Sequence, residues 1–176
     1  MRYGGWRAML AAAVLAFAVC RAYGYEAADH EEPGGQSISL AYGPAEDVRA
    51  FGFGAGTWLR NTPVLGDYAA TFFTTGWSEG FWGGVGMTLR VMPHSVYAPF
   101  LGVGGSYNHA FGEQQDKESD DGRSVASEFW AGHVEGGIKF RIPHVAGFFE
   151  LALRETWTSA DGRDYLLCVL RMGQGR

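Results

Sequence analysis

The sequence predicts an all-β protein: an eight-stranded antiparallel up-and-down transmembrane β-barrel with a packed polar interior. Three observations predict this fold class. The chain opens with an export signal, eight strand-like segments follow one another between turns, and tryptophans gather at one end of these segments. Bilayer interfaces favour Trp and Tyr because one side of the ring is apolar while the other forms hydrogen bonds. The aromatic pattern therefore indicates a membrane interface.

The first 24 residues have the features of a secretory signal peptide. Two arginines precede an apolar run over 8–19, and Ala22 and Gly24 place small residues at the positions that signal peptidase reads. This run has about 12 residues, whereas a helix needs roughly 20 to cross the hydrocarbon core. We therefore predict cleavage after Gly24. A retained membrane anchor and a lipid-modified Cys20 are the alternatives.

The mature chain is expected to form one domain. Residues 25–36 are polar and contain Gly and Pro, so we interpret them as a leader without fixed structure. The barrel is predicted over 37–172, followed by a C-terminal tail over 173–176. After cleavage the single thiol is Cys168, which excludes an intramolecular disulfide.

Composition supports an ordered membrane protein. Glycine accounts for 27 of the 176 residues and is interleaved with aromatic residues, which make up 15% of the chain. Glycine at this level without a collagen repeat or a Ser/Gln bias argues against disorder. The formal net charge of −5 gives no reason to expect a nucleic-acid partner.

Eight segments bounded by turn residues form the predicted barrel wall. Most are longer than the about 5–6 residues of a soluble strand and match the about 9–11 residues that a tilted transmembrane strand needs. The predicted strands are 37–42, 48–59, 67–77, 81–92, 96–109, 127–142, 147–157 and 163–172.

Apolar and ionic side chains alternate within these segments. In water the apolar face would form the core, whereas in a membrane it faces lipid and the polar face points inward. The interior of an eight-stranded barrel is just wide enough to be filled by side chains, so we predict salt bridges there. The predicted interior ionic network consists of Arg90, His133, Glu135, Lys139, Glu150, Arg154 and Arg171.

Loop lengths predict the orientation. The connections over 60–66, 93–95 and 143–146 are short, which is typical of periplasmic turns, whereas the long loop over 111–126 lies at the other end. This loop carries a predicted acidic surface cluster of Asp116, Glu118, Asp120 and Asp121. We expect aromatic residues at both membrane interfaces, although alternation places Trp82 on the inward face. The predicted girdle residues are Trp58, Trp77, Trp130 and Trp157, with Trp58 at the periplasmic rim.

The glycine-and-aromatic segments 99–107 and 134–140 resemble strands of the small bacterial outer-membrane barrels of the OmpA/OmpX type, a porin-like superfamily. The resemblance covers residues 37–172 and implies a filled barrel rather than an open pore. It also implies a place in the outer membrane of a Gram-negative envelope. The expected partners are outer-membrane lipid, lipopolysaccharide and the barrel assembly machinery.

No catalytic, cofactor or metal site is predicted. His133 and Glu135 lie about 6.6 Å apart along one strand, and the sequence offers no third ligand. The acidic loop lacks the glycine and glutamate positions of an EF-hand calcium loop. Lipid A deacylases need a His-x-Ser-Asn motif to supply nucleophile and base, and the histidine is absent from the corresponding region, 154–161.

We therefore expect a monomeric, non-enzymatic outer-membrane protein with a role in envelope integrity or surface interaction. One alternative is a lipid A-modifying enzyme, which would need contact between Ser159 and a distant histidine such as His109. Another is a soluble periplasmic barrel that binds an apolar ligand. In that case the face bearing Ile138, Leu151 and Leu153 would line an internal cavity.

Overall fold

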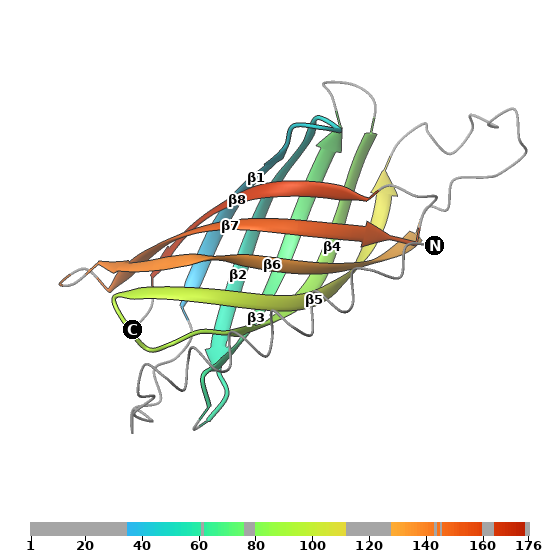
Figure 1. Ribbon diagram of the computed structural model, residues 1–176. Coiled ribbons are helices and arrows are strands. Elements are labelled where there is room, and N and C mark those ends of the chain that lie inside the picture. The colour runs from blue at the N-terminus through green and yellow to red at the C-terminus, as the bar shows by residue number, and fades with distance from the viewer. Residues whose placement is uncertain are drawn as a thin grey trace, which may run out of the picture.

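The chain forms a closed barrel of eight antiparallel strands, each paired with its neighbours in sequence, with β1 paired to β8. The computed structural model describes residues 35–60, 62–75, 80–111, 128–142, 144, 146–159 and 164–174. The strands are β1 (Gln36–Gly43), β2 (Val48–Trp58), β3 (Val64–Thr75), β4 (Gly80–Val91), β5 (Tyr97–Phe111), β6 (Glu128–Ile142), β7 (Gly147–Thr158) and β8 (Tyr165–Gln174). The predicted fold class is confirmed (Figure 1).

Several predicted features lie outside the described residues: the signal peptide, all but the end of the leader, Trp77 and the acidic loop cluster. In the part of the chain that is described, no helix has the length and apolar character needed to cross a bilayer.

The largest boundary error concerns β3, which begins three residues before the predicted start at 67. Pro63 and Gly66 suggested a turn over 60–66, but Gly66 pairs with Thr57 and Leu65 pairs with Trp58. The turn is therefore shorter than predicted, since the sheet continues through Gly66.

The predicted tail was also wrong at its start. Gly173 and Gln174 continue β8 and pair with Ser37 and Gln36 of β1. Gln36, assigned to the leader, therefore begins the barrel. These pairs close the sheet, so the last residues of β8 belong to the wall.

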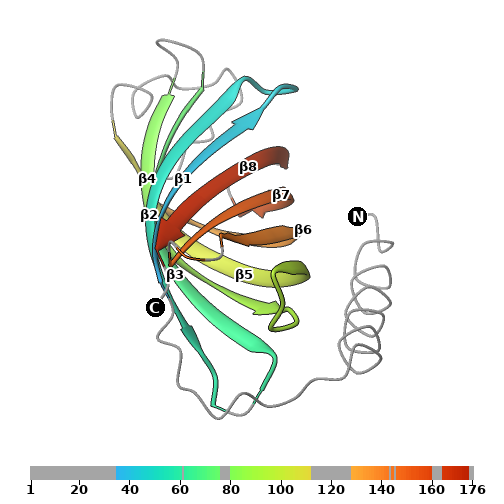
Figure 2. The same ribbon diagram turned by 90° about the vertical axis from the view of Figure 1, so that its left-hand side faces the viewer.

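The register sets the tilt of the strands. Starting at Phe140 of β6, we followed the paired residue on each successive strand once around the barrel. This path returns to β6 at Trp130, so the sheet closes with a stagger of ten residues. Strands of closed barrels with such a stagger are inclined to the axis by about 35–45°. Strands on opposite walls therefore cross steeply, as Figures 1 and 2 show for β5 to β8 against β1 to β4.

The outward face of the barrel is apolar. Leu151 is 53% exposed, and Leu153, Val103 and Phe53 are also exposed. Ile138 pairs with Leu151 and shares its face. The alternative in which Ile138, Leu151 and Leu153 line an internal ligand cavity is therefore wrong.

The interior has three layers. At the end of the barrel with the β2–β3, β4–β5 and β6–β7 connections, the short-turn end, Leu65, Met92, Ala98 and Phe100 form an apolar cluster. The opposite end, the loop end, carries the β5–β6 connection. There a second apolar cluster contains Val48, Ala50, Phe73, Trp82, Tyr165, Leu167 and Val169. Buried charged residues occupy the middle layer.

Two glycines of β6 differ in how closely the neighbouring strand β7 approaches them. A Cβ atom at Gly137 would collide with the Leu151 carbonyl oxygen and would lie 2.8 Å from the Ala152 Cα, whereas a Cβ at Gly132 meets nothing within 4 Å. We expect Gly137→Ala to lower the free energy of unfolding by about 1–3 kcal/mol, because overpacking forces the backbone to move. Gly132→Ala, the matched control, should be neutral or slightly stabilising. Urea unfolding of both variants measures this, and equal stabilities would contradict the packing.

Candidate functional site

Arg90 of β4 lies at the centre of the middle layer and is 1% exposed. Its guanidinium contacts carboxylates from three other strands. Nε donates to Glu135 Oε1 at 2.5 Å, Nη1 donates to Glu150 Oε2 at 3.2 Å, and Nη2 lies 3.0 Å from Asp67 Oδ2. A guanidinium suits this position because it is permanently charged and presents five N–H groups in one plane.

The other cations complete the network by sharing the same carboxylates. Arg154 donates to Glu135 Oε2 from Nε at 2.9 Å and from Nη2 at 2.6 Å. Arg171 Nη1 donates to Glu150 Oε2 at 2.6 Å. Its Nη2 lies 3.6 Å from Asp67 Oδ2. Every carboxylate of the network thus faces at least two cations.

Lys139 is held in two ways. Its ammonium nitrogen lies 3.5 Å from Glu150 Oε1 and 3.8 Å from the centre of the Phe148 ring. A cation over an aromatic face is stabilised by the negative charge of the ring face, the more so when water is excluded. Phe148 therefore serves as a second partner for the charge.

Glycines on β5 make room for these long side chains. A Cβ atom at Gly102 would lie 3.1 Å from side-chain atoms of Arg90 and Glu135, and one at Gly104 would lie 2.5 Å from His133 Nε2. Larger residues at these positions would displace the ionic side chains. The glycine-rich sequence of β5 is thus linked to the charged sequence of β6.

The structure places all seven residues of the predicted interior network on the inward face, with six of them joined by ion pairs. His133 is the exception, because its Nε2 lies 2.8 Å from the Thr88 hydroxyl oxygen. Sequence reasoning missed Asp67, which stood at the first position of the predicted third strand. The signal that could have found it is its place on the same strand face as Leu65 and Phe73, which are also buried.

The network offers little chemistry of its own. Both oxygens of Glu135 accept hydrogen bonds from arginines, so this carboxylate is engaged although His133 lies on the same face. Among the described residues, no group of three or more His, Cys, Asp or Glu side chains is placed to hold a metal ion. The arrangement pairs each buried carboxylate with cations.

The predicted girdle is only partly where the sequence suggested. Trp130 points outward, is 66% exposed and contacts Tyr107, with ring centres 5.0 Å apart. Trp157 is half-buried and pairs with Gly132 on the outward-facing register.

For Trp58 the girdle prediction was wrong. Its side chain packs against the apolar cluster at the short-turn end and its ring lies 3.9 Å from that of His94. The reason is the alternation of β2, which puts Phe51 and Phe53 outside and position 58 inside. Trp82 is buried and stacks on Phe73, with ring centres 5.2 Å apart.

The contact required by the deacylase alternative is not formed. The Ser159 hydroxyl oxygen accepts a hydrogen bond from the Trp130 amide at 3.0 Å. His109 Nδ1 lies 4.0 Å from Glu128 Oε1, and its ring meets Phe111 edge-on. His109 is on β5 and Ser159 directly follows β7, with β6 between them. Their backbones are therefore separated by at least two interstrand spacings, about 10 Å.

Comparison with solved structures finds the same architecture in small barrels. The N-terminal β-barrel domain of Pseudomonas aeruginosa OprF superposes with a TM-score of 0.55 at 12% identity, covering 82% of this chain and 99% of that one. The outer membrane enzyme PagL gives 0.52 at 12% identity, covering 80% and 98%. Neisserial surface protein A gives 0.51 at 12% identity, covering 81% and 91%.

A scan against protein-family models and a search of curated proteins found no match. The structural likeness establishes the fold: the chain has the architecture of small outer-membrane β-barrels, as its resemblance to strands of the OmpA/OmpX type predicted. At 12% identity this likeness does not extend to activity.

The network predicts unequal effects for two arginines. Arg90→Met leaves three buried carboxylates without their shared partner, so we expect the free energy of unfolding to fall by about 3–5 kcal/mol. Arg49→Met is the control. It removes the ion pair between Arg49 and Asp47, whose side chains are 38% and 44% exposed, respectively. Ion pairs as exposed as this one contribute about 0–1 kcal/mol to stability. Urea unfolding in detergent or vesicles measures both, and an Arg90→Met protein as stable as Arg49→Met would refute the role of the network.

Proposed function

We propose that this protein is a monomeric, non-enzymatic barrel of the bacterial outer membrane that contributes to envelope integrity or presents a surface for interaction. The observation that carries the proposal is the inverted distribution of side chains. The outward face is apolar, while the charged groups lie inside and neutralise one another. In a membrane this arrangement keeps apolar surface against lipid and charge away from it.

The filled interior favours a scaffold over a conduit. The ionic side chains of the middle layer contact one another, and an apolar cluster lies at each end of the barrel. A water-filled path would have to cross all three layers. The side chains that could bind a solute in the middle layer are already paired.

The separation of Ser159 from His109 supports a non-enzymatic role. PagL shows that an enzyme can share this fold, so the fold alone does not decide the matter. The hydroxyl of Ser159 has the Trp130 amide as its partner instead of an imidazole. A nucleophile needs an adjacent base to be activated.

Loop lengths support an orientation with the short-turn end in the periplasm and the loop end outside. The loop end would then present the acidic cluster of Asp116, Glu118, Asp120 and Asp121 to the surroundings. The proposed partners are outer-membrane lipid and lipopolysaccharide, with the barrel assembly machinery acting during insertion.

Fractionation followed by electrophoresis tests the proposed location. The expressed full chain should be found in the outer-membrane fraction, and its unboiled form should migrate differently from its boiled form. A soluble periplasmic protein without this heat-dependent shift would contradict the proposal.

The lipid-facing assignment predicts a position-dependent cost for arginine. Leu151→Arg, at mid-strand on the outward face, should cost about 2–4 kcal/mol and reduce the amount of folded protein in the membrane. Leu59→Arg is the matched control, because Leu59 is exposed in the turn after β2, where the cost should be about 0–1 kcal/mol. The heat-dependent shift in membrane fractions measures the folded amount. Equal yields of the two variants would count against lipid contact at Leu151.

The filled interior predicts the absence of a steady conductance. Purified protein inserted into a planar bilayer should produce no stable current steps at moderate voltage, because the paired charges and apolar ends block the lumen. Reproducible ohmic steps that scale with the amount of folded protein would overturn the scaffold proposal.

The two proposed roles can be separated in the source bacterium. A strain lacking the protein should become sensitive to detergents if the barrel supports envelope integrity. A variant with 113–125 replaced by a short Gly/Ser turn should restore resistance, because the barrel itself is kept. If the shortened variant inserts normally but fails to restore the phenotype, the exposed loop carries the function.

A further inference from the structure

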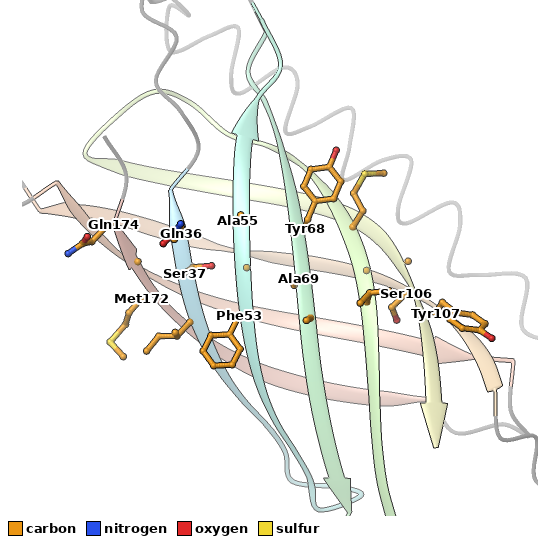
Figure 3. A pocket seen from close by; sticks show the side chains of 18 of the residues that line it. Gln36, Ser37, Phe53, Ala55, Tyr68, Ala69, Ser106, Tyr107, Met172 and Gln174 are labelled. Atoms are coloured by element: carbon orange, nitrogen blue, oxygen red, sulfur yellow. The ribbon is translucent and has the colours of Figure 1, made fainter. Parts of the chain in front are cut away.

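A long groove crosses the outward face of the wall from β8 and β1 to β5 and β6 (Figure 3). Its volume is ≈ 1180 Å³, and it is open to the surroundings along its length. The groove follows the direction of the interstrand hydrogen bonds and therefore runs obliquely to the barrel axis. It is a feature of the proposed lipid-facing surface and is separate from the ionic interior.

Small residues at outward positions account for the groove. Ala55, Ala70 and Gly105 form its floor on β2, β3 and β5, and larger outward side chains that also line it, such as Phe53 and Tyr68, stand beside them. A gap beside apolar side chains costs dispersion energy unless other atoms fill it. The shape therefore favours an apolar occupant.

Apart from Tyr68 on β3, the large polar and amphipathic side chains of the groove lie at its two ends. Gln36 and Gln174 are at the short-turn end, while the Tyr107 and Trp130 rings form the other end. Between them the lining is mainly apolar. Six interstrand spacings from β8 to β6 give a length of roughly 29 Å around the wall. The mainly apolar middle of the groove matches a long hydrocarbon chain.

We propose that the groove binds an acyl chain of an outer-leaflet lipid whose headgroup lies at the Tyr107–Trp130 end. Trp and Tyr prefer the headgroup level, and the groove is continuous with the apolar face around it. A flexible chain can follow an oblique path around a convex wall, whereas the convex wall of a second barrel would meet it along a narrow line. This inference rests on the proposed membrane location.

Photocrosslinking of the full chain tests the site. The protein is reconstituted into phosphatidylcholine vesicles that contain a small fraction of phosphatidylcholine with a photoreactive diazirine, placed near either the carboxyl or the methyl end of one acyl chain. Crosslinked peptides are located by mass spectrometry. Ala70→Phe fills the groove with an apolar ring. Val103→Phe adds the same ring at an exposed outward position outside the groove and serves as the matched control. The heat-dependent shift verifies that each variant is folded.

Crosslinks should concentrate on groove residues, with the carboxyl-end probe nearest Tyr107 and Trp130. They should fall several-fold in Ala70→Phe and stay unchanged in Val103→Phe. An even distribution around the barrel, the reverse order of the two probes, or crosslinks between two protein chains at the groove would overturn the site while leaving the membrane location intact. Failure of the unmodified protein to enter vesicles with a heat-dependent shift would instead overturn the proposed function and this inference with it.

Discussion

Arg90 joins carboxylates from β3, β6 and β7, and only the first of these strands is its neighbour in the sheet. Its contacts with Glu135 and Glu150 therefore bridge separate parts of the wall through the lumen. Taking charges out of water costs several kcal/mol for each ion, and good geometry with several partners is needed to offset this cost. The distance across the lumen between β4 and the strands β6 and β7 must therefore match the length of the Arg90 side chain.

The rest of the interior follows from this requirement. The long side chains of Arg90 on β4 and Glu135 on β6 need space, and the inward Gly102 of β5 provides it. Arg154 and Arg171 then balance the carboxylates that Arg90 shares. The apolar clusters at the two ends flank the ionic layer, which strengthens its electrostatic contacts by excluding water. The filled lumen of the proposed scaffold thus follows from the pairing of these buried charges.

The alternation of β6 shows how far the sequence alone could lead. Glu135 and Lys139 differ so clearly in polarity from Val134 and Ile138 that the inward face could be assigned from the pattern of side chains. The fold class followed from strands of this kind. Long-range pairing could not be predicted, because the ten-residue stagger depends on which residues lie opposite each other across every pair of strands. The convergence of Asp67, Glu135 and Glu150 on Arg90 is a product of that register.

Errors arose where side chains gave weaker signals. Trp58 was assigned by its position near a strand end, although the alternation of Phe51 and Phe53 puts it inside. Gly66 was interpreted as a turn residue because glycine is common in turns, yet it pairs within β3. A glycine within a strand and a glycine in a turn look alike in a sequence. They can be distinguished only when it is known whether the glycine pairs with a residue of the neighbouring strand.

The orientation of the two faces is tested most directly by spin labels placed one at a time at positions 149, 151, 152 and 153 of β7, with Cys168 first replaced by Ala. In vesicles, labels at 149, 151 and 153 should collide freely with oxygen dissolved in the bilayer and remain shielded from a water-soluble nickel reagent. A label at 152, on the inward face, should be shielded from both. The opposite phase, or access of the nickel reagent to 151, would contradict a barrel with lipid outside and a closed ionic layer within.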